Sequence, residues 1–253
     1  MSRYRHAPTA RARRLAALVP LLGTVALATA CTATEDPPAA APTSTAPTSA
    51  PASTTPTGPA SPSDSAPATI PTSAFVELPT ELRKSPRRAT SVGDALPKLC
   101  ANEFGTGDRQ VTASAAMTVT YKLADEPSSN VPQGMIHQTI FSFDGDGASA
   151  YLTRLRTAIE ACPTYERSGP VTVQSKTLTG VGDEALLLTR TWPETALSGE
   201  RTGRLASSQI AVARVDDAVT VLDDQGWEGT SGNPTILDRT LRDGVRAIDT
   251  WQR

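Results

Sequence analysis

A tract of low complexity limits how this chain can fold. Residues 32–72 consist almost entirely of Ala, Pro, Thr and Ser, ten of the 21 prolines lie between Pro37 and Pro71, and Ile70 is the only large aliphatic residue in the tract. Such a segment cannot bury enough apolar surface to offset the entropy that it loses on ordering. We therefore predict a disordered tether with polyproline character over residues 31–72, and a folded domain confined to residues 73–253.

The first 30 residues have the pattern of an export signal. Five arginines precede an apolar run from Leu15 to Ala28, and the small residues Ala28-Thr29-Ala30 follow. The run is shorter than the ~20 apolar residues of a membrane-spanning helix. We therefore predict a signal peptide over residues 1–30. Arg13-Arg14 permits twin-arginine export, but the residues after the pair fit it poorly, so we favour the general secretory route.

Cys31 follows this signal directly and resembles the acylated cysteine of a bacterial lipobox. The usual lipobox has leucine three positions before the cysteine, whereas this chain has Ala28 there and Leu27 one position further back. We expect Cys31 to be acylated, and more than one acyl chain suffices for stable anchoring. The predicted location is the outer face of the cytoplasmic membrane or the cell wall, with plain secretion as the alternative.

The mature chain is acidic. Removing the first 30 residues takes away five of the 24 Lys and Arg and none of the 26 Asp and Glu, which leaves a formal charge of −7. This balance does not favour nucleic-acid binding, so we expect no nucleic-acid partner.

The other two cysteines, Cys100 and Cys162, remain as a pair if Cys31 is acylated. An exported compartment permits disulfides, so we expect a Cys100–Cys162 bridge. Two buried free thiols are the alternative.

The periodicity from residue 91 onwards predicts an α+β fold. Ser91 caps a short helix that Pro97 interrupts, Asn233 caps a final helix with Pro234 at its first position, and a helix over residues 148–162 has one continuous apolar face. Strands are predicted at residues 117–123, 135–143, 171–178, 184–192, 204–215 and 218–223. The order α-ββ-α-ββββ-α predicts an antiparallel sheet of about six strands with flanking helices.

We find no pattern of catalytic, metal or cofactor-binding residues. His137 is the only histidine of the mature domain and lies in a predicted strand, where a hydrogen-bonded side chain is the better interpretation. No zinc-type cluster of His and Cys occurs. Asp144-Gly145-Asp146 lacks the terminal Glu of a calcium loop and favours a helix-capping turn. We therefore predict no catalytic residue, no metal and no cofactor, and the ligand-binding residues stay unknown.

Two kinds of side chain leave alternatives open. Asp183-Glu184 and Asp223-Asp224 are adjacent carboxylates, which divide acid and base roles in some hydrolases but are more often solvated strand ends. Trp192 and Trp227 fall at predicted strand ends, where we favour covering of the sheet edge over lining of a cleft.

Several short motifs together resemble the extracytoplasmic sensor-domain family named for the mycobacterial kinase PknH, which also occurs in actinobacterial lipoproteins. They are Leu99-Cys100, the helix from Ala148 to Cys162, Gly180-Val-Gly-Asp-Glu-Ala185 before a strand, and the hairpin from Val212 to Leu222. The resemblance covers most of residues 75–250. It implies an antiparallel sheet with flanking helices, disulfide support and a ligand-binding cleft. The kinase sensor has two disulfides, whereas this domain has cysteines for one.

The expected function is therefore that of a cell-envelope lipoprotein, not an enzyme, whose sensor-like domain binds an unidentified ligand or partner outside the membrane. Membrane attachment is expected through acylated Cys31. The alternatives are an envelope hydrolase that uses carboxylates alone, and a structural spacer without a ligand.

Overall fold

The computed structural model describes residues 69–107, 111–196 and 198–253. The predicted signal peptide, Cys31 and almost all of the predicted tether lie outside the described residues. Contacts with the core begin at Ile70, which packs beside Phe75, Ile140 and Ile248.

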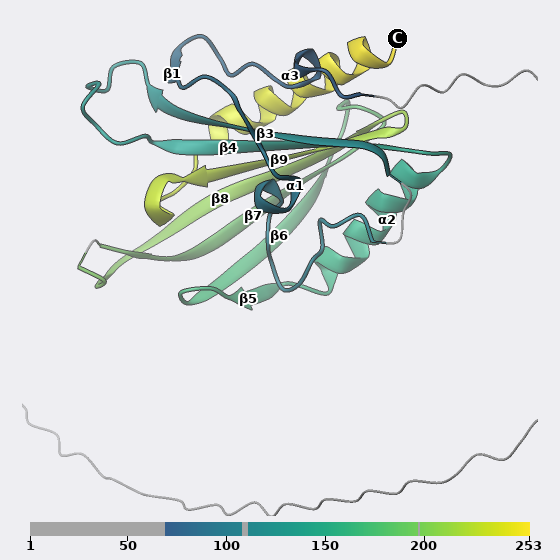
Figure 1. The fold of residues 1–253 in the computed structure, drawn as a ribbon. Helices are drawn as coiled ribbons and strands as arrows, with labels where there is room; N and C mark the ends of the chain where they lie inside the picture. Colours follow the sequence, from purple (N-terminus) through teal and green to yellow (C-terminus); the bar gives the residue numbers. More distant parts are fainter. Residues whose placement is uncertain (1–68, 108–110, 197) are drawn as a thin grey trace, which may run out of the picture. The chain divides into compact units, whose positions relative to one another are not determined.

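All described strands belong to one antiparallel sheet with the order β1-β3-β4-β9-β8-β7-β6-β5, in which β2 also pairs with β3 (Figure 1). The strands are β1 (Leu82–Lys84), β2 (Arg88–Thr90), β3 (Val111–Leu123), β4 (Gly134–Phe143), β5 (Thr164–Glu166), β6 (Pro170–Leu178), β7 (Glu184–Thr195), β8 (Arg201–Val215) and β9 (Ala218–Gly226). The last strand in sequence, β9, lies between β4 and β8 and joins the first hairpin to the later strands.

The predicted α+β class is confirmed, but the sheet has nine strands and not about six. All six predicted strands are present. The three that the prediction missed, β1, β2 and β5, have three residues each and lie toward the edges of the sheet. They are too short for an alternation of apolar and polar residues to be recognised.

Helices α2 (Gly147–Glu160) and α3 (Pro234–Gln252) cover opposite faces of the sheet (Figure 1). Helix α2 packs on Ile210 and Val212 of β8, whereas α3 packs on Ala211 and Ala213 of the same strand. Successive residues of a strand point to opposite faces, so the two helices enclose the sheet between them. This explains why the middle of β8 and β9 is buried on both faces.

Two of the three described α-helices have an N-cap side chain that accepts a backbone hydrogen bond. The side chain of Ser91 accepts a hydrogen bond from the Asp94 backbone N–H at the start of α1 (Val92–Ala95). The side chain of Asn233 accepts one from the Thr235 backbone N–H at the start of α3. The Asp146 side chain at the start of α2 makes no such bond, so the predicted capping turn lacks its carboxylate cap. Among the described residues, none of these helices has the length and apolar content to cross a membrane.

Candidate ligand-binding site

Helix α2 covers only part of its face of the sheet, and polar side chains continue that face beyond the helix. On β7, β8 and β9, the residue that follows the apolar ones on this face is polar or charged. These residues are Arg190, Ser208 and Asp223. On β4 the same face carries His137, which lies directly opposite Asp223. The sheet therefore brings these side chains together from four separate strands.

Arg190 and Asp223 form a buried ion pair in this polar area. The Arg190 Nη2 atom donates to Asp223 Oδ1, and the two side chains are only 5% and 1% exposed. Arg190 Nε donates to Ser208 Oγ at 2.9 Å, and Gln225 Nε2 donates to Asp223 Oδ2 at 2.7 Å. The guanidinium and the carboxylate are thus each held by a second partner.

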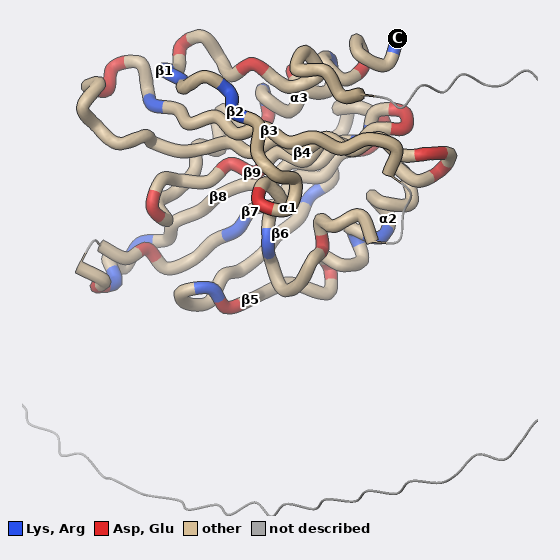
Figure 2. Tube along the Cα trace, in the orientation of Figure 1, with Lys and Arg blue, Asp and Glu red and all other residues tan. Residues whose placement is uncertain are grey.

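A pocket of about 330 Å³ opens over this ion pair. Its floor is formed by strand residues, which are Met135, Arg190, Trp192, Ser208 and Gln225. Its walls include Arg167 from the turn after β5, and Trp227 and Glu228 from the short helix η2 (Trp227–Gly229). We call it the sheet-face pocket. Figure 2 shows a basic and an acidic residue side by side at the end of β5, and both charge signs interspersed over the domain.

Two of the three tryptophans of the chain line this pocket. The expectation that Trp192 and Trp227 cover the sheet edge is therefore wrong. Strands β7 and β9 run three residues beyond their predicted ends. Trp192 consequently lies within β7 opposite Ala206, on the face that carries Arg190.

Arg190 is not among the residues that we predicted from the sequence, although a signal for it was present. Arg190 follows Leu186 and Leu188 at the alternate positions that a half-buried strand turns toward its core. A charged residue at such a position demands a buried partner. That partner, Asp223, was considered only as half of an acidic pair.

The four carboxylates of the hydrolase alternative do not share one cleft. Asp183 bonds to Arg214 at 2.9 Å, and Glu184 pairs with Arg156 of α2. Asp223 and Asp224, being neighbours in a strand, point to opposite faces.

Asp224 lies buried beneath the start of α3. Its Oδ1 accepts a hydrogen bond from the Tyr121 hydroxyl at 2.8 Å, and its Oδ2 accepts one from the Asn233 backbone N–H at 2.5 Å. Burial raises the pKa of Asp224 to about 6, against these two hydrogen bonds. Asp224 thus anchors the connection between β9 and α3.

His137 is hydrogen-bonded, as the sequence analysis favoured. Its Nδ1 lies 2.7 Å from the Thr118 Oγ1 atom. Burial lowers the pKa of His137, although the nearby Asp223 carboxylate opposes this shift. This lowered pKa favours the neutral imidazole.

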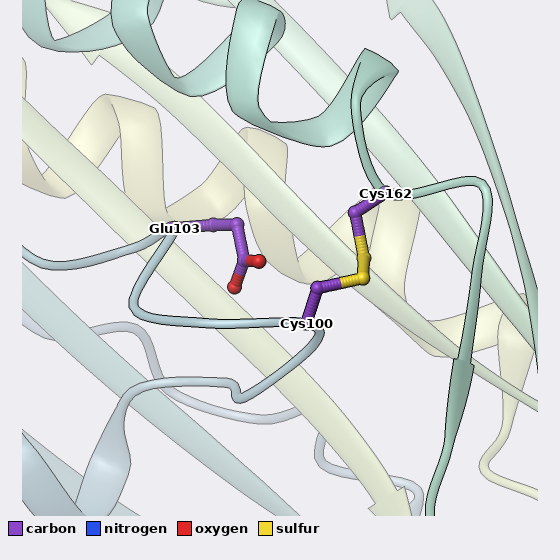
Figure 3. A group of neighbouring side chains, drawn as sticks. All are labelled: Cys100, Glu103 and Cys162. Carbon is purple, nitrogen blue, oxygen red and sulfur yellow. A yellow bond between two sulfur atoms is a disulfide. The ribbon is translucent and has the colours of Figure 1, made fainter. Parts of the chain in front are cut away.

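The expected pair Cys100 and Cys162 forms a disulfide with a Cα–Cα distance of 6.0 Å. Figure 3 shows the carboxylate of Glu103 beside the two sulfur atoms. The three side chains lie close enough to hold a metal ion if the sulfurs were reduced. In the disulfide the sulfurs are bonded to each other and are not thiolate ligands. The bridge ties the segment after α1 to the end of α2.

A second depression, of about 370 Å³, lies at the opposite ends of the strands. It is lined by Ser142, Asp216, Asp217, Trp251 and Gln252. Asp217 and Gln252 are hydrogen-bonded to each other across it, and no ion pair lies at its base among the described residues. We therefore take the sheet-face pocket as the candidate site.

We compared the chain with protein-family models, curated proteins and solved structures, and only the comparison with solved structures gave a match. No protein-family model and no curated protein matches the chain. Among solved structures, the extracellular domain of PknH from Mycobacterium tuberculosis matches with 14% sequence identity and a TM-score of 0.40, over 68% of this chain and 86% of that chain. A TM-score of this size carries no conclusion on function, so we base the proposals below on the residues of this chain.

Proposed function

We propose that this chain is an exported, membrane-anchored protein whose folded domain binds a ligand in the cell envelope and catalyses no reaction. The observation that carries the proposal is the buried Arg190–Asp223 pair, whose guanidinium forms part of the floor of a pocket that two tryptophans line.

A buried ion pair contributes little to the stability of a fold. Removing two charges from water costs several kcal/mol per ion, and well-packed apolar residues in their place are often as stable or more so. Here the pair lies where the pocket opens, and it holds a guanidinium at a fixed position. Such preorganisation reduces the cost of ordering side chains when a ligand binds.

The side chains of the pocket favour binding over acid–base catalysis. The only carboxylate in its floor network, Asp223, accepts hydrogen bonds from both Arg190 and Gln225. Burial lowers the pKa of His137 and favours its neutral form, and its Nδ1 is hydrogen-bonded to Thr118. The four carboxylates named for the hydrolase alternative do not share this pocket, and the spacer alternative predicts a surface without a pocket.

The cellular location in this proposal rests on the sequence. The export signal and Cys31 favour a lipid anchor, and the predicted tether would hold the domain away from the membrane. About 36 extended residues at ~3.1 Å each reach on the order of 110 Å. The ligand is then a component of the envelope beyond the membrane surface.

A thermal-shift screen tests this function. The mature chain, carrying Cys31→Ser to avoid acylation, is heated with envelope lipids, glycans and peptidoglycan fragments. A ligand at a hundred times its Kd adds about 2.7 kcal/mol, which corresponds to a Tm increase of about 5–10 °C for a domain of this size. Trp192→Ala should abolish the shift, and Trp251→Ala, in the second depression, should preserve it. An unchanged Tm across the whole panel would overturn the proposal.

A further inference from the structure

The charges of the sheet-face pocket nearly cancel. Asp223 neutralises Arg190 at the floor, and the walls add one basic residue, Arg167, and one acidic residue, Glu228. Neither of these two forms an ion pair among the described residues. A phosphate or polycarboxylate site concentrates unpaired positive charge, and a metal-ion site concentrates carboxylate oxygens. The pocket therefore suits a ligand without net charge.

The hydrogen-bonding groups at the floor offer donors and acceptors side by side. The Nε2 atom of Gln225 is used by Asp223, so its Oε1 remains as an acceptor. The Ser208 oxygen accepts from Arg190, so its O–H remains as a donor. Arg190 has five N–H groups, of which Ser208 and Asp223 take two. A hydroxyl group both donates and accepts, and several adjacent hydroxyls match this mixture.

The same pocket also carries apolar side chains. Trp192, Trp227 and Met135 line it together with the polar floor. The Trp227 Nε1 atom is buried with no hydrogen-bond partner among the described residues. A buried donor without a partner destabilises the folded protein by about 1–3 kcal/mol. A ligand that supplies an acceptor to this N–H group would remove that penalty on binding. An acyl chain would fill the apolar part of the pocket, but it would leave the remaining hydrogen-bond donors and acceptors of the floor without partners.

We propose that the ligand is a neutral saccharide. The apolar C–H face of a pyranose ring packs against an indole, and its hydroxyl groups bond to Arg190, Ser208 and Gln225. A volume of about 330 Å³ accommodates roughly one or two rings, at the lower end of the range for ligand pockets. The pocket is open to solvent, so a glycan longer than two rings would extend out of it. This inference rests on the proposed function.

Titration of the mature Cys31→Ser chain with four neutral trisaccharides tests the ligand class. Chitotriose, cellotriose, maltotriose and mannotriose are added singly, and tryptophan fluorescence and calorimetry follow binding. We expect at least one to bind with a Kd below 1 mM. Trp192→Ala should weaken it at least tenfold, and Ser208→Ala severalfold.

Trp251→Ala is the matched control, because Trp251 lies at the opposite ends of the strands. It should leave the saccharide affinity unchanged, and urea unfolding should show that each variant is folded. Saccharide binding that Trp192→Ala leaves intact would overturn the assignment to this pocket.

Three further probes separate failure of the ligand class from failure of the proposed function. They are inorganic phosphate, a D-alanyl tetrapeptide and phosphatidylglycerol vesicles. Binding of one of these with the same Trp192 dependence, and of no trisaccharide, would overturn the saccharide class and preserve the binding domain. Binding of no probe at all would overturn both proposals.

Discussion

Asp223 and Asp224 are adjacent residues with opposite surroundings. Asp223 lies buried on the sheet face that carries the pocket and is paired with Arg190, whereas Asp224 faces α3 and bonds to Tyr121 and Asn233. Strand geometry alone separates the two carboxylates. An acidic dipeptide in a strand is therefore weak evidence for a shared catalytic site.

Arg190→Met should destabilise the domain by about 3–5 kcal/mol, because it leaves the Asp223 charge buried without a partner. Adding Asp223→Asn should recover part of the lost free energy of unfolding, because the double variant has no buried charge at this site. Urea unfolding of the single and double variants measures both changes. The exposed pair of Arg239 with Glu81 provides a control, because solvent screens such a pair and Arg239→Met should leave the free energy of unfolding almost unchanged. A double variant no more stable than Arg190→Met would contradict this account.

Asp224 should make stability depend on pH between about 4 and 6. Burial raises the folded-state pKa of Asp224 from 3.8 to about 6, so the folded state binds the proton more tightly than the unfolded state does. Its contribution to the free energy of unfolding therefore falls as pH rises through this window.

Asp224→Asn removes this titration. An amide oxygen can still accept from the Asn233 N–H, and the amide nitrogen can donate to Tyr121. The stability of the wild type relative to the variant should decrease by on the order of 2–3 kcal/mol between pH 4 and pH 7. Urea unfolding at several pH values measures it. Parallel pH profiles for the two proteins would show that Asp224 does not titrate in this range.

Among the elements, length decided what could be predicted from the sequence. The six strands of nine or more residues and the two long helices were predicted, because each shows its period over several residues. Strands β1 and β2, with the sequences Leu-Arg-Lys and Arg-Ala-Thr, show no period at all. They exist because the edge of β3 offers unpaired backbone groups to them.

The Cys100–Cys162 bridge should stabilise the elements that it joins. It closes a loop with a sequence separation of 62 residues, and the chain-entropy model gives about 4 kcal/mol for that length. We expect Cys100→Ala to lower the Tm under oxidising conditions. Thermal melts with and without a reducing agent measure the effect.

The double variant Cys100→Ala/Cys162→Ala is the control for the bridge. Its Tm should not respond to the reducing agent, whereas the wild type should lose stability in it. A wild-type Tm that reduction leaves unchanged would mean that the bridge adds nothing to folding.

For the whole molecule, the fold was more predictable than the site. The α+β class and the order of the main elements follow from local periodicity. The sheet-face pocket depends on which strands become neighbours, because β4, β7, β8 and β9 each supply part of it. Residues between 135 and 230 come together there, and no local pattern in the sequence predicts that they do.

The attachment of the whole molecule to the membrane depends on Cys31, which lies outside the described residues. In a bacterial host, Cys31→Ser should release the chain from the membrane fraction, because the hydroxyl of serine cannot take the place of the acylated thiol. Fractionation and intact mass measure the release and the lost acyl groups. Ala28→Leu restores the usual lipobox leucine and should keep the chain in the membrane. Equal membrane retention and an unmodified mass for the wild type and Cys31→Ser would refute acylation and leave plain secretion.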